Sequence, residues 1–243
     1  DVVIAAAKMR QLIGFDISER KRMPTWTDAL RKFIDQVDSI GIMVMCSGVV
    51  MNNNHRHLNP EEFRGFAMAD PLAPLVFLNG ADTKAAQMFT LAHEIAHIWL
   101  GQSAVSDVQA SWISDHRVER WCNKVAAEFL VPLDLIKHDF EKDADLQDEF
   151  NRLARRFKVS TLVILRRLYD AGGITLDEFQ QIYRQELARL ISIVAKGGGG
   201  NFYLTQAARV SKRFARALIA NTLEGLTLHR DAFRMLGFSK LAT

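Results

Sequence analysis

The spacing of hydrophobic positions divides this chain into helical and strand-forming parts. Apolar residues recur at helical spacing from Val3 to Ile13 and again up to Val37, where Thr25 or Thr27 can cap the second helix. Three short runs rich in β-formers follow, at residues 41–50, 64–69 and 75–78. From residue 89 onward the spacing is again mostly helical. The pattern predicts an α+β fold with a small three-stranded sheet and helices at both ends.

Polar stretches interrupt this pattern. We interpret residues 19–22 as a charged, solvated turn, with a nucleic-acid contact as the alternative. Residues 52–57 are predicted to form a polar loop with His55 and His57 exposed; a loop that contacts substrate is the alternative. Residues 101–114 are expected to form a loop at the mouth of a cleft, where Trp112 either holds the loop to the core or lines a pocket.

The helical stretch 89–100 contains the motif His-Glu-x-x-His at residues 93–97. Its two histidines, His93 and His97, share one helical face and can bind a single metal ion, and Glu94 can act as the general base. The pattern could arise by chance, but apolar neighbours would then bury the three polar side chains without partners. The motif is typical of hydrolases in which zinc keeps one coordination position open for water.

A third ligand is expected from the helical stretch 116–130, which ends before Pro132. Glu119 borders the apolar stripe of this helix, and Asn123 lies one turn further along the same face. We therefore predict that Glu119 binds the metal and that the amide of Asn123 hydrogen-bonds a ligand histidine. Three other side chains remain as weaker candidates for the third ligand: Asp115, His116 and Glu128.

Residues 90–101 and 119–132 resemble the paired motifs of the ImmA/IrrE family of metallopeptidases, including the run Asn-Lys-Val-Ala-Ala-Glu-Phe-Leu-Val-Pro that starts at Asn123. The resemblance covers roughly residues 40–174. It implies a zincin-like minimal metallopeptidase core, with Glu94 catalytic and zinc bound by His93, His97 and Glu119. It also implies a protein substrate, often a transcriptional repressor or an antitoxin-like partner. One departure is Cys122, because alanine more often precedes the asparagine, and it leaves the ligands untouched.

The strand predicted before the metal helix offers a way to hold substrate. It lies between Pro74 and Asn79, and a proline at its start is compatible with the edge of a sheet above the cleft. We expect an extended peptide to add to this edge through main-chain hydrogen bonds. The predicted substrate-binding residues are Leu75, Val76, Phe77 and Leu78. The loop at residues 101–114 is the next candidate.

Residues 153–168 have the apolar spacing and central turn of a helix-turn-helix, in which Ser160 caps the second helix. Arg166 and Arg167 could face phosphates in such a motif. Apolar residues nevertheless occupy most of the second helix and leave few polar side chains to contact base edges. Packing of these helices behind the peptidase core is therefore the favoured interpretation.

The C-terminal part is predicted to contain helices at residues 205–221 and 227–236, after a flexible hinge at Gly197–Gly200. Residues 201–243 hold seven basic side chains against two acidic ones, Glu224 and Asp231. The basic residues are Arg209, Lys212, Arg213, Arg216, Arg230, Arg234 and Lys240. Such a surface contacts nucleic acid or an acidic partner, or it is the solvated flank of a helix that docks on the body.

Composition adds few constraints. Hydrophobic residues make up 49% of the chain and charged residues 24%, as in ordinary soluble proteins, and a net charge of +3 is too small to argue for nucleic acid. The two cysteines, Cys46 and Cys122, have no metal or redox spacing and fit a reducing cytoplasm. Cys122 is expected to pack, although a thiol near zinc could compete for the open position. No apolar run is long enough to span a membrane.

We therefore expect an N-terminal helical segment (1–38), a zincin-like metallopeptidase domain (39–187) and a C-terminal helical segment (201–243). Because the first residue is Asp1 rather than Met, we also allow for an upstream DNA-binding domain or a removed leader. The predicted function is that of a zinc-dependent endopeptidase acting on an intracellular regulatory protein, such as a repressor or a toxin–antitoxin partner. The alternative is a DNA-binding or antitoxin-type regulator that uses the fold as a scaffold, and only hydrolysis requires the carboxylate of Glu94.

Overall fold

The computed structural model describes residues 1–50, 53–107, 117–194 and 209–238. Three helices open the chain: α1 (Val2–Ile13), α2 (Ile17–Arg22) and α3 (Trp26–Ser39). Thr25 caps α3 by accepting a hydrogen bond from the backbone N–H of Asp28. The prediction of a solvated turn at residues 19–22 is wrong, because these residues form most of α2 and Arg20 is 1% exposed. The charged residues in this stretch do not reveal that the Arg20 guanidinium reaches a backbone carbonyl in the interior, that of Leu130.

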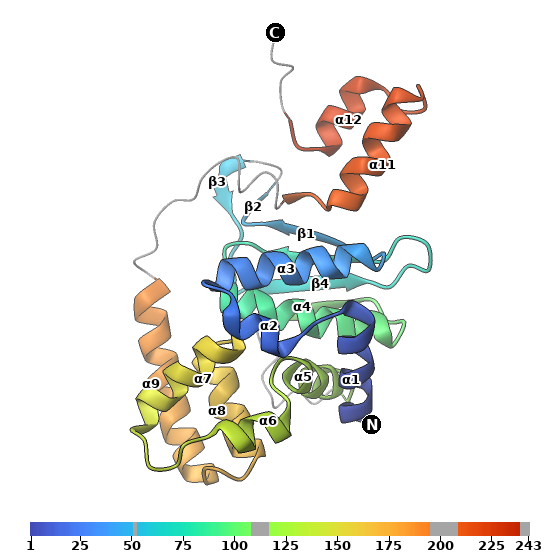
Figure 1. Cartoon of the computed structure of the whole chain (residues 1–243). Coiled ribbons are helices and arrows are strands. Elements are labelled where there is room, and N and C mark those ends of the chain that lie inside the picture. Colours follow the sequence, from blue (N-terminus) through green and yellow to red (C-terminus); the bar gives the residue numbers. More distant parts are fainter. Residues whose placement is uncertain (51–52, 108–116, 195–208, 239–243) are drawn as a thin grey trace.

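A four-stranded sheet lies beside these helices, with the strand order β1-β5-β4-β6 (Figure 1). Its strands are β1 (Met43–Ser47), β4 (Phe63–Met68), β5 (Leu75–Asn79) and β6 (Ala104–Asp107). Strand β1 is parallel to β5, whereas β4 is antiparallel to both β5 and β6. The α+β class and the three predicted strands are confirmed. Strand β6 adds a fourth, within the stretch that was predicted to be a loop.

Two short strands, β2 (Val49–Val50) and β3 (Asn53–His57), form a separate antiparallel pair. The predicted polar loop at residues 52–57 is therefore largely a strand. Its two histidines, His55 and His57, are exposed as expected. Because residues 52–57 are all polar, they show no alternation of apolar and polar side chains from which a strand could be predicted.

Strand β5 is an interior strand of the sheet, so the prediction that Leu75–Leu78 forms its edge is wrong. Leu75 pairs with Met43 of β1, and Leu78 pairs with Gly65 of β4. Pro74 precedes the strand and removes no hydrogen-bond donor from it, and its carbonyl accepts the N–H of Met43 at 2.9 Å. Both sides of β5 are therefore occupied by neighbouring strands.

Helix α4 (Lys84–Trp99) packs against strands β4, β5 and β6, and helix α5 (Arg117–Leu130) packs on α4. Figure 1 shows α4 below the sheet, with α5 and α1 lying further below. Thr83 caps α4 by accepting the N–H of Ala86 at 3.2 Å, and Gly101 follows its end with a φ of 67°. One hydrophobic core joins α1, α3, the sheet, α4 and α5.

Four more helices follow α5: α6 (Leu133–Asp139), α7 (Leu146–Phe157), α8 (Thr161–Asp170) and α9 (Leu176–Val194). Ser160 caps α8, as expected from the sequence, by accepting the N–H of Val163. Arg167 is buried and donates to the carbonyl of Val131 at 2.8 Å, so it does not face a phosphate. Helices α7 and α8 pack on each other and contribute side chains to the hydrophobic core, in agreement with a structural role.

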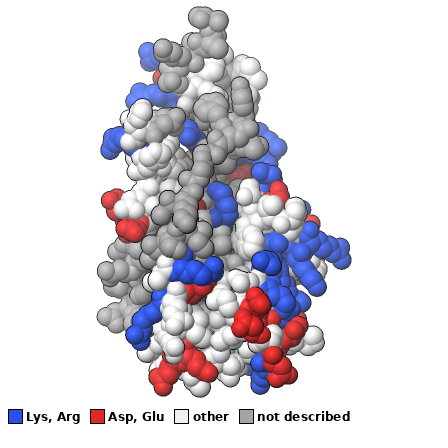
Figure 2. Space-filling view, turned by 90° about the vertical axis from the view of Figure 1, so that its left-hand side faces the viewer, with Lys and Arg blue, Asp and Glu red and all other residues white. Residues whose placement is uncertain are grey.

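Helices α11 (Lys212–Leu223) and α12 (His229–Met235) form a hairpin that projects at the top of Figure 1. The predicted hinge at 197–200 and the start of the predicted helix at 205 lie outside the described residues. In the face shown in Figure 2, basic side chains occur from top to bottom, whereas most acidic ones lie in the lower half. None of the described helices combines the length and apolar character needed to cross a bilayer.

Candidate metal centre

Helix α4 presents His93 and His97 one turn apart on a buried face. The two rings are only 2% and 1% exposed, and their Nε2 atoms lie 3.0 Å apart. The apolar residues around the motif, such as Leu91, Ile95 and Ala96, belong to the hydrophobic core and bury this part of the helix. Two imidazole nitrogens therefore point to one place in a largely apolar setting.

Helix α5 adds a carboxylate at the same place. Glu119, in its first turn, brings Oε2 to 3.2 Å from His93 Nε2 and Oε1 to 3.1 Å from His97 Nε2. Among the described residues these three form the group whose geometry suits a metal ion, with ligand atoms all within 4.8 Å of one another. The structure thus brings the three predicted ligands together.

The donor set and its spacing fit zinc. Two imidazole nitrogens and one carboxylate oxygen, each about 2.0–2.2 Å from a tetrahedral zinc ion, would be separated by about 3.3–3.5 Å. The separations here, 3.0–3.2 Å, are close to that value. Three protein ligands also leave a fourth position for a reacting molecule, as in catalytic rather than structural zinc sites.

Residues 37–169 match the family model of the IrrE N-terminal-like domain, peptidase family M78. The match spans 133 of the 243 residues and contains the whole triad. The chain belongs to this family. M78 is a family of metallopeptidases, in agreement with the metal centre described above. Residues 210–243 match a second model, a domain of unknown function, and no curated protein matches the chain significantly.

The pKa shifts of His93 and Glu119 in this M78 site favour metal binding. Burial lowers the pKa of His93, although hydrogen bonding to Glu119 opposes this effect. Hydrogen bonds from His93 and His97 hold the pKa of the Glu119 carboxyl well below its usual range. A neutral imidazole and an ionised carboxylate are the forms in which these side chains bind a metal ion.

Glu94, the predicted base of the M78 motif, is fully buried next to β4. Gly65 of β4 allows the close approach: a Cβ at this position would lie 2.7 Å from both Phe77 O and Thr90 Cγ2, and 3.4 Å from Glu94 Oε1. Any larger residue would push the strand away from α4. Sequence reasoning missed Gly65, although an isolated glycine within a strand is a known sign of such an approach.

Two further residues of α5 lie near the ligands. Asn123 lies one turn after Glu119 on α5 and is 1% exposed. Its amide raises the pKa of His93. Neither amide atom has a hydrogen-bond partner of normal geometry among the described residues. Cys122 is fully buried, and burial together with the charges of Glu119 and Glu94 raises its pKa to about 12. A neutral thiol of this kind favours the packing role over competition for a metal ion.

The other candidate ligands lie elsewhere or outside the described residues. Glu128 forms a buried ion pair with Arg167 and accepts the N–H of Leu133 at 3.3 Å. Glu128 therefore stabilises the structure through these contacts, and it lies more than two helical turns from Glu119. Asp115 and His116 lie outside the described residues, as does Trp112.

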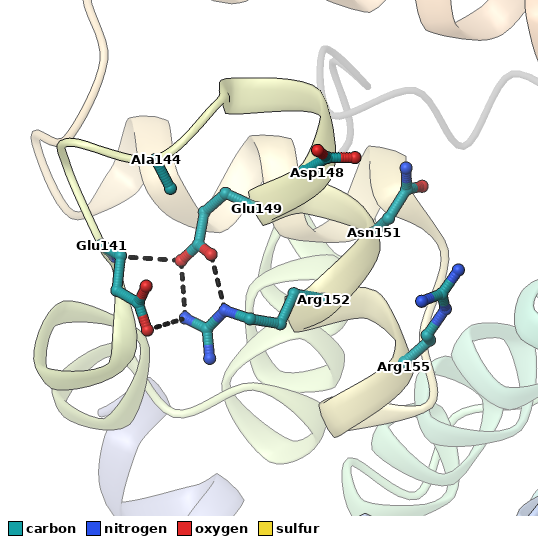
Figure 3. Close-up of a pocket in the computed structure, with 7 residues that line it drawn as sticks. All are labelled: Glu141, Ala144, Asp148, Glu149, Asn151, Arg152 and Arg155. Atoms are coloured by element: carbon teal, nitrogen blue, oxygen red, sulfur yellow. Dashed lines mark hydrogen bonds and ion pairs between the residues drawn. The ribbon is translucent and has the colours of Figure 1, made fainter.

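A hollow of about 410 Å³ lies along α7, away from the triad. Figure 3 shows Arg152 between Glu149 and Glu141. The N···O distance is 2.6 Å to Glu149 and 3.5 Å to Glu141. The remaining lining residues are Ala144, Asp148, Asn151 and Arg155. Because Arg152 and Glu149 neutralise each other in an ion pair, this hollow does not resemble a catalytic site. The His93–His97–Glu119 triad remains the candidate functional site.

Proposed function

We propose that this M78 peptidase is a zinc-dependent endopeptidase that cleaves a regulatory protein inside the cell. The observation that supports it is the convergence of His93, His97 and Glu119 beside the buried carboxylate of Glu94. The two histidines and Glu119 hold the ion. Bound zinc supplies a Lewis acid that polarises the scissile carbonyl and lowers the pKa of water.

Glu94 performs the proton transfers in this proposal. Its carboxylate takes a proton from the attacking water and passes it to the nitrogen of the leaving amine. Because residue 65 is a glycine, β4 lies close to α4 and covers the carboxylate of Glu94. The buried surroundings of Glu94 limit competing solvent at this carboxylate.

Substrate binding is assigned to strand β6 instead of β5. Strand β6 is an outer strand of the sheet, it pairs with β4, and it packs on the metal helix α4. No described strand pairs with its other side. An extended peptide can add there through main-chain hydrogen bonds, which favours substrates with an unfolded segment.

The class of substrate rests on the resemblance to ImmA/IrrE peptidases, whose targets are often repressors or antitoxin-like proteins. A regulator that only uses the fold as a scaffold would need the metal ligands but not Glu94. The two functions therefore make different demands on a single side chain.

The test replaces Glu94 by Gln in the zinc-loaded chain and uses Glu62→Gln, an exposed position, as the matched control. Cleavage of a library of unstructured peptides is followed by mass spectrometry. We expect Glu94→Gln to keep its zinc and to lose about 10²–10⁴-fold in rate, because an amide cannot accept the proton. Equal cleavage by Glu94→Gln and the parent would exclude the mechanism, and zinc binding without cleavage by the parent would favour the scaffold.

A further inference from the structure

The C-terminal end of α5 is bound by arginines from three other helices. Arg10 of α1 donates to the carbonyl oxygens of Glu128 and Phe129, at 2.6 and 3.3 Å. Arg20 of α2 donates to that of Leu130 at 2.5 Å. Arg167 of α8 donates to that of Val131 at 2.8 Å and pairs with the Glu128 side chain. Four consecutive carbonyl groups, at and just beyond the end of α5, thus receive guanidinium groups.

These contacts suit the end of a helix. The last carbonyls of a helix lack partners within it, and its C-terminus carries a partial negative charge that cations stabilise. A single basic side chain or a glycine cap commonly fulfils this role. Here three arginines, one each from α1, α2 and α8, bind the end of α5.

Arg20 is buried at an evident energetic cost. It is 1% exposed, and its Nε and Nη1 atoms have no hydrogen-bond partner among the described residues. Its guanidinium lies 4.2 Å from the ring centre of Phe15, which in turn stacks on Phe129 of α5 at 4.7 Å. Burying a cation with so few partners costs stability, and a second role of its position would account for that cost.

Helix α5 connects this end to the metal centre. Glu119 precedes Leu130 by eleven residues, which corresponds to about 16 Å along a helix. Because an α-helix is stiff along its axis, a shift at one end moves the other end by a similar amount. Metal–ligand distances tolerate only about 0.2 Å, so a small sliding of α5 on α4 would take Glu119 out of range.

We propose that Arg10, Arg20 and Arg167 form a clamp that sets the axial position of α5 and thereby places Glu119 at the metal centre. The proposal rests on the proposed metallopeptidase function and names residues that position one of its ligands. Arg10 and Arg20 precede residue 37, where the match to the M78 family begins. Helices α1 and α2 therefore complete the metal site from outside the family-matched region.

The experiment compares Arg20→Met with Arg31→Met in the full chain. Arg31 is an exposed arginine on α3 and serves as the matched control. Zinc affinity is measured by competition with a chelator of known affinity, and the geometry of the site by the visible absorption of the cobalt-loaded protein. We expect Arg20→Met to weaken zinc binding about 10- to 100-fold and to change the cobalt spectrum, with Arg31→Met unchanged.

A double-mutant cycle with Glu119→Ala tests the route of the effect. If the clamp acts through Glu119, Arg20→Met weakens zinc binding no further in the Glu119→Ala background. A lower unfolding temperature with unchanged zinc affinity and cobalt spectrum would overturn the clamp and leave Arg20 a structural role. Equal weakening in both backgrounds would also overturn it.

If Arg20→Met does not fold, Arg10→Met is tested by the same measurements, because Arg10 is only partly buried.

Two outcomes distinguish failure of the clamp from failure of the proposed function. Zinc binding by Glu119→Ala as tight as that of the parent would show that the ligand set, and with it the proposed function, is wrong. The clamp fails by itself when Glu119→Ala loses zinc but the arginine variants do not.

Discussion

The metal-bearing helices and the C-terminal hairpin are held in opposite ways. Helix α4 is covered by strands on one side and by α5 on another, and both helices contribute many fully buried side chains. In the described α11–α12 hairpin, large apolar side chains are mostly exposed. Among the described residues sixteen large hydrophobic side chains are exposed, and six of them lie within residues 219–238: Ile219, Leu223, Leu226, Leu228, Met235 and Phe238.

The attachment of the hairpin is also narrow. Asp38, at the end of α3, accepts a hydrogen bond from the Ser211 hydroxyl and another from the N–H of Arg213 at 3.0 Å. Lys212 pairs with Asp35 at 2.6 Å. The hairpin thus joins the body largely through polar contacts at the start of α11.

This difference follows from what each region must do. Metal ligands have to stay within tenths of an ångström of their working positions, so the helices that carry them are fixed from several sides. The hairpin carries no such site among the described residues. Regions with few buried contacts open locally at low free-energy cost, and we expect the hairpin to open independently of the body.

The largest effect is expected from Phe129→Ala. Phe129 is fully buried and stacks on Phe15 and Phe33, with ring centres at 4.7 and 5.4 Å. Its truncation should lower the free energy of unfolding by about 3–5 kcal/mol. Leu218→Ala, the matched truncation in the hairpin, should change the unfolding of the body by less than about 1 kcal/mol. Urea denaturation followed by tryptophan fluorescence measures both, because all four tryptophans precede the hairpin.

Equal destabilisation of the body by the two truncations would show that the hairpin unfolds together with the core. The two regions would then differ in how exposed their apolar side chains are, but they would unfold in one cooperative transition.

A smaller effect is expected from Asp38→Ala. This change leaves two donors at the start of α11 without their buried acceptor, which costs about 1–3 kcal/mol of local stability. Hydrogen exchange should accelerate in α11 and α12 while zinc content and the exchange of α4 stay unchanged. The control is Asp35→Ala, which removes an exposed ion pair and should have an effect of about 0–1 kcal/mol. Faster exchange in α4 would indicate that the hairpin supports the metal helices.

The smallest effect concerns the sheet edge beside the metal helix. Neighbouring residues of a strand point their N–H groups to opposite sides, so one of Val105→Pro and Ser106→Pro removes an outward donor and the other a donor facing β4. The outward variant should raise KM for peptides about 3- to 10-fold with zinc content normal. The inward variant should destabilise the sheet. An unchanged KM in a folded outward variant would exclude β6 as the binding edge.

Local patterns were sufficient for most of the fold and for the chemistry of the metal motif. The spacing of His93 and His97 within one helix places both rings on one face whatever surrounds them, because helical geometry is local. Caps at Thr25 and Ser160 were predictable for the same reason, since a cap satisfies donors only two or three residues away. The apolar stripe of the helix predicted at residues 116–130 indicated Glu119 as the third metal ligand, and the family resemblance supported that prediction.

Strand order and the uses of buried charge were decided only by tertiary structure. Whether β5 is an edge or an interior strand depends on β1 and β4, which reach it from distant parts of the chain. The sequence around Arg20 predicted a solvated turn, because the carbonyl that Arg20 binds, that of Leu130, lies 110 residues away. Helix periodicity and capping depend on neighbours in sequence, whereas pairing partners and burial depend on neighbours in space, and those exist only once the chain has folded.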